Sequence, residues 1–175
     1  VVVGGGPSGL ASACKLKQLN QNLSVCLLEK GSEIGSHIIS GAVFEPQTLF
    51  DLFPEEAKNC PTLKTSVVKD DLYWLANNNK SIKVPSWLMP KSLHNKGNYI
   101  ISLGELCQWI AERAMDLGVD IFPGFPAQQY LSDTNGRVIG IATGDMGIDK
   151  DGNQKGTYAP GMDILAKQTI FAEGA

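Results

Sequence analysis

The chain opens on an apolar strand that runs directly into a glycine-rich turn. Residues 1–3 are all valine, and Gly4, Gly6 and Gly9 then give the spacing G-x-G-x-x-G ahead of an alanine-rich helix. The first glycine permits a tight turn, the second lets a ligand approach the backbone, and the third lets the helix pack closely on the strand. The N-terminus of such a helix carries unpaired N–H groups, so the pattern favours a bound phosphate group.

A second strand and an acidic residue follow at the spacing that the same fold requires. Residues 23–28 are mostly apolar, as expected of a parallel strand buried on both faces, and Glu29 comes twenty residues after Gly9. A carboxylate at this point accepts hydrogen bonds from ribose hydroxyls and would repel a 2′-phosphate. Strand, turn, helix, strand and acid are in register, so the sequence predicts a dinucleotide-binding β-α-β unit rather than an unrelated glycine turn.

Composition and charge limit the classes of partner. Of the 175 residues, 43% are hydrophobic and 19% are charged, as in ordinary globular proteins, and the formal net charge is −3. The lysines look scattered along the chain, so nucleic acid is not expected as a partner. For the same reason, any attraction to a membrane is expected to be apolar rather than electrostatic. No run of 18 apolar residues predicts a membrane-spanning helix.

Both ends of the chain fall inside predicted strands. Val1 already belongs to the first strand, and residues 169–174 are predicted to form a strand that enters another glycine turn. We therefore expect the sequence to be a piece of a longer protein, whose targeting signals would lie outside it.

The four cysteines show no metal-binding spacing. Cys14, Cys26, Cys60 and Cys107 include no C-x-x-C pair, which argues against a zinc or iron-sulfur site among them, and no metal site is predicted. Three of the four lie in predicted helices or strands, where a free cysteine acts as a small hydrophobic residue. A reactive thiol is the alternative, and the absence of a paired framework is typical of a reducing compartment.

A long apolar segment follows the first β-α-β unit. Residues 34–53 hold few charges, and Pro46 suits the start of a short helix. Leu49, Phe50 and Phe53 would cover this helix on more than one side, which exceeds what a surface helix needs. Burial against another domain is one interpretation of this segment, and a position in the headgroup region of a membrane is the other.

Residues 60–100 look like an antiparallel insertion. They contain short segments of strand composition and a hairpin turn at residues 77–79. Residues 85–90 form an apolar loop bounded by prolines. We expect strands at residues 65–69, 72–75 and 81–84.

The remaining sequence returns to the nucleotide-binding pattern. Ser102 and Glu105 form a capping box for an amphipathic helix that Gly118 ends, and a third parallel strand and a β-meander follow. Residues 144–161 read as a surface loop, whose aspartates suit turns better than calcium. The final strand, from Thr169, should return beside the first. The other expected strands are residues 119–122, 129–132 and 138–143.

These elements together predict an α/β protein. Residues 1–33 and 101–175 would form a Rossmann-like three-layer fold with a β-meander, and residues 34–100 an inserted antiparallel α+β segment of the kind that faces a substrate.

Several motifs, taken together, resemble the electron transfer flavoprotein-ubiquinone oxidoreductase family. The similarity runs nearly end to end. The glycine turn is shared by all glutathione-reductase-like flavoproteins, whereas residues 37–46 and residues 150–152 are more particular to this family. The motifs are the turn at 4–9, Leu28-Glu29-Lys30, residues 34–35 with His37, residues 40–42, 97–100, 140–143 and 170–174.

The resemblance implies a piece of the N-terminal FAD domain of a monotopic membrane flavoenzyme. Such an enzyme passes electrons from reduced electron transfer flavoprotein, through FAD and an iron-sulfur cluster, to ubiquinone at the bacterial plasma membrane or mitochondrial inner membrane. Its cluster cysteines, its quinone pocket and the rest of its FAD domain would lie beyond the last residue. We therefore nominate no catalytic residue, and expect the piece alone to be inactive and to lack stoichiometric flavin.

The resemblance also assigns cofactor-binding residues. Four residues of the turn would hold the pyrophosphate, Glu29 the adenosine ribose, and Lys30 the adenine end. His37 is interpreted as structural because no second ligand lies near it. The turn residues are Gly4, Gly6, Ser8 and Gly9; Ser40, Gly41 and Ala42 would line the flavin, Ala127 the adenine, and Ala172, Glu173 and Gly174 the pyrophosphate or ribityl chain.

The same resemblance favours the membrane interpretation of the apolar segment. The residues predicted to face the membrane are Ile34, Ile38, Ile39, Val43, Phe44, Leu49, Phe50 and Phe53. Two other functions stay open from the sequence. One is an FAD-dependent monooxygenase or geranylgeranyl-type reductase, which shares the turn and the meander, and the other is a dinucleotide-binding scaffold without enzymatic activity.

Overall fold

The computed structural model describes residues 1–149 and 151–174, which form two compact units. The first unit contains Val1–Ile39 and the described residues from Leu103 onward, and the second is Ser40–Ser102. The insertion was expected at residues 34–100, whereas the second unit begins at Ser40 and ends at Ser102. Residues 34–39 belong with the first unit. As a division of the whole protein into domains, it stays a prediction.

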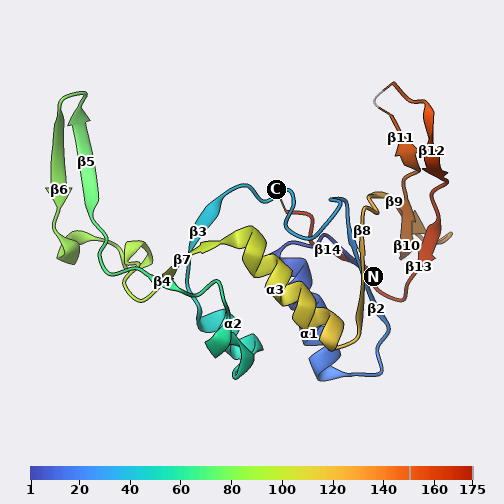
Figure 1. Ribbon diagram of the computed structural model, residues 1–175, viewed down its shortest axis with the longest axis horizontal. Coiled ribbons are helices and arrows are strands. Elements are labelled where there is room, and N and C mark those ends of the chain that lie inside the picture. The colour runs from blue at the N-terminus through green and yellow to red at the C-terminus, as the bar shows by residue number, and fades with distance from the viewer. Residues whose placement is uncertain (150, 175) are drawn as a thin grey trace. The chain divides into compact units, whose positions relative to one another are not determined.

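A four-stranded parallel sheet forms the centre of the first unit (Figure 1). Its strands are β1 (Val2–Val3), β2 (Val25–Glu29), β8 (Val119–Pro123) and β14 (Ile170–Phe171). The order is β14-β1-β2-β8, so the last described strand lies beside the first, as predicted. Val2 is paired with Ile170 on one side and with Leu27 on the other. Val2 and Val3 are almost fully buried, and so are Leu27 and Leu28, which explains why these strands are apolar at successive positions.

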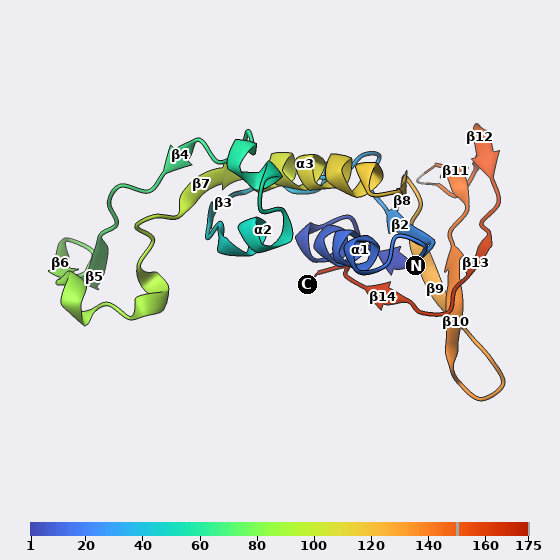
Figure 2. The same cartoon turned by 90° about the horizontal axis from the view of Figure 1, so that it is seen from below.

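Two helices pack against this sheet and against each other, as Figures 1 and 2 show. They are α1 (Pro7–Leu19) and α3 (Leu103–Asp116), and both were predicted from the sequence. The helix α1 buries Leu10 and Ala13, and α3 buries Leu106 and Cys107. Burying one leucine side chain contributes about 2 kcal/mol, so these helices and the sheet form a core that holds the glycine turn in place.

A β-meander supplies a third layer. Its strands are β9 (Ala127–Ser132), β10 (Val138–Thr143) and β13 (Asp163–Leu165), in the order β13-β10-β9. Ile141 of β10 packs with Val3 and Leu28 of the parallel sheet in one buried cluster. The turn at Asp133 closes β9 on β10, because its carboxylate accepts hydrogen bonds from the amides of Asn135 (2.8 Å) and Arg137 (3.0 Å). The predicted three-layer fold with a meander is therefore confirmed.

The segment expected to be a loop, residues 144–161, contains a hairpin instead. Its strands are β11 (Met146–Ile148) and β12 (Gln154–Ala159), which pair antiparallel. The Asp149 carboxylate accepts hydrogen bonds from the amides of Asp151 (2.9 Å) and Asn153 (2.8 Å), and these bonds hold its pKa below the usual value. Turn chemistry was therefore the right interpretation of Asp149, but the flanking residues pair with each other instead of forming a loop.

The second unit contains a small antiparallel sheet, with two short helices between the first two of its strands along the chain. The sheet has the order β3-β7-β4, with β3 (Gly41–Phe44), β7 (Tyr99–Ser102) and β4 (Thr65–Ser66). The strand β4 is shorter than the predicted residues 65–69, and Ser102 ends β7 directly before α3. The helices are α2 (Gln47–Leu52) and the 3-10 helix η1 (Glu56–Asn59).

A second hairpin lies between β4 and β7, with two short helices after it. We call residues 68–96 the hairpin arm. It contains β5 (Leu72–Asn77), β6 (Lys80–Val84), η2 (Ser86–Leu88) and η3 (Lys91–Leu93). The strands β5 and β6 pair only with each other among the described residues, and the predicted turn at residues 77–79 joins them.

Candidate functional site

A cavity of about 550 Å³ lies at the glycine turn of the first unit. This volume is in the usual range for pockets that bind small molecules. The walls come from the turn, the end of β2, residues 35–38, the segment between β8 and β9, and the residues after β14. Nine of the predicted cofactor-binding residues line it: Gly4, Gly6, Ser8, Glu29, Lys30, Ala127, Ala172, Glu173 and Gly174.

Two glycines of the turn are required by close contacts between backbone segments. Gly4 has a φ of +106°, and a Cβ atom there would collide with the carbonyl oxygen of Ala172. A Cβ atom at Gly9 would collide with the carbonyl oxygen of Gly4. The Gly4 amide also donates a hydrogen bond to the carbonyl oxygen of Leu28 at 2.8 Å. Gly9 therefore allows the helix to contact the backbone of the turn closely, but it does not line the cavity itself.

Gly6 has a different environment. A Cβ atom at this position would meet no atom of the described residues within 4 Å, although Gly6 lines the cavity. The chain therefore leaves open the space beside this residue that a ligand needs to approach the backbone. The structure here fits the role that the sequence predicts for the second glycine of the turn.

The first turn of α1 can bind an anion next to Gly6. The earliest bond of this helix runs from the Leu10 amide to the Gly6 carbonyl oxygen at 3.0 Å, so the amides of Ser8 and Gly9 precede the first intrahelical bond. No acidic residue lies in the first turn to compensate the positive end of the helix dipole. Together with the open space at Gly6, this arrangement fits the pyrophosphate of a dinucleotide.

Glu29 is held in place by two backbone amides. Its Oε2 accepts a hydrogen bond from the Gly5 amide at 2.8 Å, and its Oε1 accepts one from the Gly31 amide at 2.7 Å. These bonds fix the carboxylate at the end of β2 while each oxygen keeps a lone pair for a ribose hydroxyl. Burial and the nearby Glu29 charge raise the pKa of the Cys107 thiol to about 11, so this thiol stays protonated at neutral pH.

Apolar residues between β8 and β9 form another wall of the cavity. Phe125, Pro126 and Ala127 line it, and the Phe125 amide donates a hydrogen bond to the Glu29 carbonyl oxygen at 2.9 Å. The Phe125 ring packs edge-on against Phe122, with 5.9 Å between the ring centroids. This wall is apolar and lies next to the Glu29 carboxylate, so it suits a flat adenine ring.

The structure does not bring every predicted site residue to the cavity. Ser40 begins the second unit, and Gly41 and Ala42 lie in β3; none of the three lines the cavity. Their contact with a flavin ring stays a prediction.

Sequence reasoning missed two residues of this site. Gly5 is buried and its amide donates to Glu29; a Cβ atom there would collide with the Ile34 side chain, so the position requires glycine. His37, interpreted from the sequence as structural, is exposed and lines the cavity, and its role stays a prediction. The usable signal was its place in the short connection that follows Glu29, because a cofactor fold brings that connection to the ligand.

The predicted membrane-facing residues separate into different environments. Ile34, Leu49 and Phe53 are buried, so the prediction is wrong for these three. Ile34 packs against Gly5, and α2 packs with η1, which accounts for the burial of apolar residues in α2. Ile38 lines the cavity instead. Phe44 and Phe50 are half-buried, whereas Ile39 and Val43 are exposed.

The largest exposed apolar side chains of the second unit lie elsewhere, in the hairpin arm. Trp74 is 69% exposed and Trp87 is 80% exposed, and Leu75 and Leu88 are exposed as well. Within residues 1–149 and 151–174, no helix combines the length and the apolar character needed to span a bilayer.

Known proteins resemble this chain in fold and in sequence, and they bear out the family resemblance that the motifs indicated. Residues 2–55 match the family model of an NAD(P)-binding Rossmann-like domain. Over 99% of its length, the chain is 55% identical to the electron transfer flavoprotein-ubiquinone oxidoreductase of Pseudomonas aeruginosa and covers 32% of that protein. It is 42% identical to the human mitochondrial protein of the same name, again over 99% of its length, and covers 28% of it. The resemblance is confirmed over the whole chain, which spans about a third of the relatives' length.

Solved structures share the fold at low sequence identity. A geranylgeranyl bacteriochlorophyll reductase-like protein from Thermoplasma acidophilum superposes with a TM-score of 0.67 at 23% identity, covering 99% of this chain and 38% of that one. A myxobacterial chondrochloren halogenase, described as a variant of FAD-dependent halogenases, gives a TM-score of 0.63 at 17% identity, with 99% and 36% covered. These likenesses confirm the Rossmann-like α/β fold.

Proposed function

We propose that this chain is part of the FAD-binding domain of an electron transfer flavoprotein-ubiquinone oxidoreductase. The whole protein would take electrons from reduced electron transfer flavoprotein and pass them, through FAD and an iron-sulfur cluster held elsewhere in the protein, to ubiquinone. The observation that carries the proposal is the open space at Gly6, which faces the cavity beside a fixed Glu29 carboxylate. The identity of 42% to 55% with proteins of this name supports the choice among dinucleotide-binding enzymes.

The residues of the cavity would bind and orient the cofactor. The amides of Ser8 and Gly9 would donate to the pyrophosphate, Glu29 would accept from the adenosine ribose, and Ala127 would contact the adenine. Ala172 and Gly174 bring a second backbone segment to the same cavity. FAD, when bound, supplies the electron-carrying chemistry. None of these roles requires a general acid or base, so no catalytic residue is assigned in this chain.

The charge at Glu29 bears on cofactor choice. A 2′-phosphate placed at the ribose would face a carboxylate whose two oxygens are fixed by Gly5 and Gly31. The repulsion between the Glu29 carboxylate and that phosphate favours a cofactor without a 2′-phosphate, such as FAD.

Membrane association is the second part of the proposal. A monotopic protein needs an exposed apolar surface that can enter the headgroup region of a bilayer. In the hairpin arm, Trp74 and Ile82 are paired across β5 and β6 on one face, and both are exposed. Tryptophan is enriched at the interface between membrane and water, because its ring is apolar and its N–H is polar. The bacterial plasma membrane and the mitochondrial inner membrane are the two candidates.

Anaerobic reduction of the full-length protein tests the proposed activity. We expect reduced electron transfer flavoprotein to bleach the flavin absorbance, and a ubiquinone analogue to restore it. Bleaching by NAD(P)H without electron transfer flavoprotein would instead indicate a monooxygenase or a geranylgeranyl-type reductase. A flavin that neither donor bleaches would indicate a scaffold and contradict the proposal.

A further inference from the structure

Positive charge is concentrated in the hairpin arm. Residues 68–96 contain five lysines and two aspartates, a formal net charge of +3, whereas the whole chain carries −3 and the rest of it therefore −6. The lysines are Lys69, Lys80, Lys83, Lys91 and Lys96, and all five are exposed. The sequence-based view that the lysines are scattered is thus wrong for this part of the chain.

We propose that the hairpin arm binds anionic phospholipid headgroups, with Lys80, Lys91 and Lys96 as the contacting cations. The proposal rests on the membrane association argued above and adds the class of lipid. It assigns to the lysines an electrostatic attraction that the exposed apolar side chains cannot supply, because apolar burial does not distinguish neutral from anionic headgroups.

The ion pairs of the arm single out these three lysines. The Asp71 carboxylate forms ion pairs with the ammonium groups of Lys83, at 2.7 Å, and of Lys69, at 3.1 Å. These two lysines hold the pKa of the Asp71 carboxyl group below its usual value. The other acid, Asp70, accepts a hydrogen bond from the Asn95 amide at 2.6 Å. Among the described residues, Lys80, Lys91 and Lys96 have no acidic partner within 4.0 Å, so their charges remain available to a ligand.

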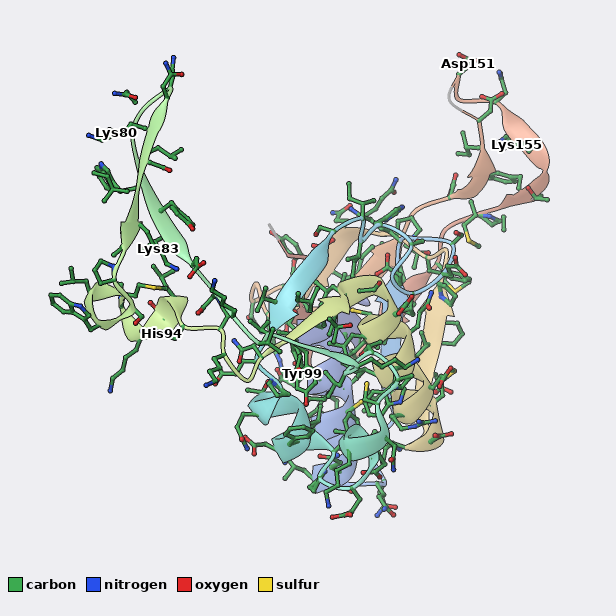
Figure 3. The ribbon with its side chains drawn as sticks, turned by 60° about the vertical axis from the view of Figure 1, so that its left-hand side comes forward. Lys80, Lys83, His94, Tyr99, Asp151 and Lys155 are labelled. Atoms are coloured by element: carbon green, nitrogen blue, oxygen red, sulfur yellow. The ribbon has the colours of Figure 1, made fainter. Side chains whose placement is uncertain are left out.

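The strand register places a free lysine beside the apolar face. Trp74 is opposite Ile82, and Lys80 is two residues from Ile82 on β6, so Lys80 and Ile82 point to the same side. Lys83 is opposite Tyr73 on the other side. Figure 3 shows Lys80 nearer the hairpin tip than Lys83. A lysine stem can lie along apolar surface while its ammonium group reaches the phosphates at the membrane surface.

A lipid surface fits these features better than a nucleic acid or an acidic protein. A nucleic-acid site needs a dense basic patch, and three free lysines among exposed tryptophans do not form one. An arm with interfacial aromatic residues and flanking lysines is the combination that amphipathic membrane-binding segments use.

Vesicle binding by the full-length protein tests the proposal. We expect it to bind phosphatidylcholine vesicles weakly and vesicles with equal parts of phosphatidylglycerol more tightly, and added salt should remove the difference. The double variant Lys80→Gln/Lys91→Gln should bind the anionic vesicles about 25-fold more weakly, since each lysine near a charged surface contributes about fivefold. Binding to phosphatidylcholine should not change.

Two further variants separate charge from damage to the fold. Lys155→Gln changes an exposed lysine of β12, outside the arm, and should bind like the wild type. Asp71→Asn removes the acid that pairs with Lys69 and Lys83, and should strengthen binding to anionic vesicles by about fivefold. A gain confined to anionic vesicles separates charge from misfolding, because apolar side chains exposed by a misfolded arm would strengthen binding to both kinds of vesicle.

The possible outcomes distinguish this proposal from the proposed function. Equal wild-type binding to both kinds of vesicle would overturn the lipid selectivity but leave membrane association standing. No binding to either kind would overturn both. If the double variant kept its vesicle binding but lost binding to electron transfer flavoprotein, the lysines would serve a protein partner, and the lipid proposal would be wrong.

Discussion

The cavity and the hairpin arm are built in opposite ways. At the cavity, close contacts between backbone segments define the structure: Gly4 and Gly9 lie so near to neighbouring backbone that no side chain fits. In the arm, large side chains such as Trp74 and Trp87 lie exposed. Changes at Gly4 or Gly9 should therefore disturb the fold and the cofactor site together. Changes in the arm should alter binding to a partner and leave the fold intact.

Substituting a tryptophan in the core of the first unit and another in the hairpin arm gives the largest expected contrast. Trp109 of α3 is 7% exposed and carries Arg113 over its ring, at 5.5 Å from the centroid. Trp109→Ala should lower the free energy of unfolding by about 4 kcal/mol, because it leaves a cavity in the core. Trp87→Ala should change that free energy by less than about 0.5 kcal/mol.

Vesicle binding should reverse that order. Trp87→Ala removes an interfacial ring and should weaken binding to vesicles by about 2 kcal/mol. Urea denaturation and vesicle sedimentation of the full-length protein measure the two effects. If Trp87→Ala destabilised the fold as much as Trp109→Ala, the arm would not be the exposed surface that the contrast requires.

Two glycines of the same turn sharpen the contrast within the cavity. Gly9→Ala should destabilise the protein by about 3 kcal/mol, since its Cβ would collide with the Gly4 carbonyl oxygen. Gly6→Ala should cost under about 1 kcal/mol, because no chain atom lies in the way and only the N-cap preference is lost.

Cofactor binding separates Gly6 from a purely structural residue. If the open space at Gly6 serves the pyrophosphate, Gly6→Ala should lower the affinity for FAD by at least about tenfold, equal to 1.4 kcal/mol. Titration of the apoprotein with FAD, followed by the change in flavin fluorescence, measures this. An unchanged affinity would show that the pyrophosphate does not approach Gly6.

A substitution of Glu29 should lower the free energy of unfolding by less than Gly9→Ala does. Glu29→Gln leaves one acceptor oxygen for two amide donors, at Gly5 and Gly31, and should lower the free energy of unfolding by about 2 kcal/mol. It should also weaken the discrimination against a ribose 2′-phosphate. The matched control is Glu173→Gln, an exposed carboxylate in the same cavity, expected within about 0.5 kcal/mol of the wild type. Equal losses in both variants would contradict the anchoring role of Glu29.

The parts of the site that could be predicted from sequence are those that depend on backbone geometry. Gly4, Gly6 and Gly9 each occupy a position where the fold excludes or leaves room for a side chain, and such requirements are local in the sequence. The return of β14 beside β1 follows from the topology of parallel sheets. The role of Gly5 was not predicted, because its amide bonds to Glu29, which lies 24 residues away in the sequence.

Burial of apolar residues could not be predicted in the same way. Leu49 and Phe53 are buried, yet Trp74 and Trp87 are exposed, although all four lie in apolar stretches of the second unit. Composition gives the tendency to leave water, but the packing partners decide which segment does so, and η1 as a partner of α2 was not foreseen. Ion pairs have the same property: Lys69 is close to Asp71 in the sequence, whereas the pairing of β5 with β6 brings Lys83 to Asp71.

A further effect, confined to alkaline pH, concerns the buried thiols of the first unit. Burial raises the pKa of Cys14 to about 12, and burial with the Glu29 charge raises that of Cys107 to about 11, from an ordinary value of 9.0. Between pH 9.0 and these values, the unfolded chain releases thiol protons that the folded chain keeps. Stability should therefore be unaffected by the thiols below pH 9.0 and decline as the pH rises toward 11.

Urea midpoints at mildly and strongly alkaline pH measure this decline. Cys107→Ala removes one of the thiols whose pKa is raised, so its midpoint should fall less steeply with pH than that of the wild type, whatever its stability at neutral pH. In the folded protein, iodoacetamide should leave both thiols unmodified at neutral pH, because the thiolate is the reactive form. Rapid modification of Cys107 would mean that the helix α3 opens beside the cavity, and would remove the rigidity that distinguishes the cavity from the arm.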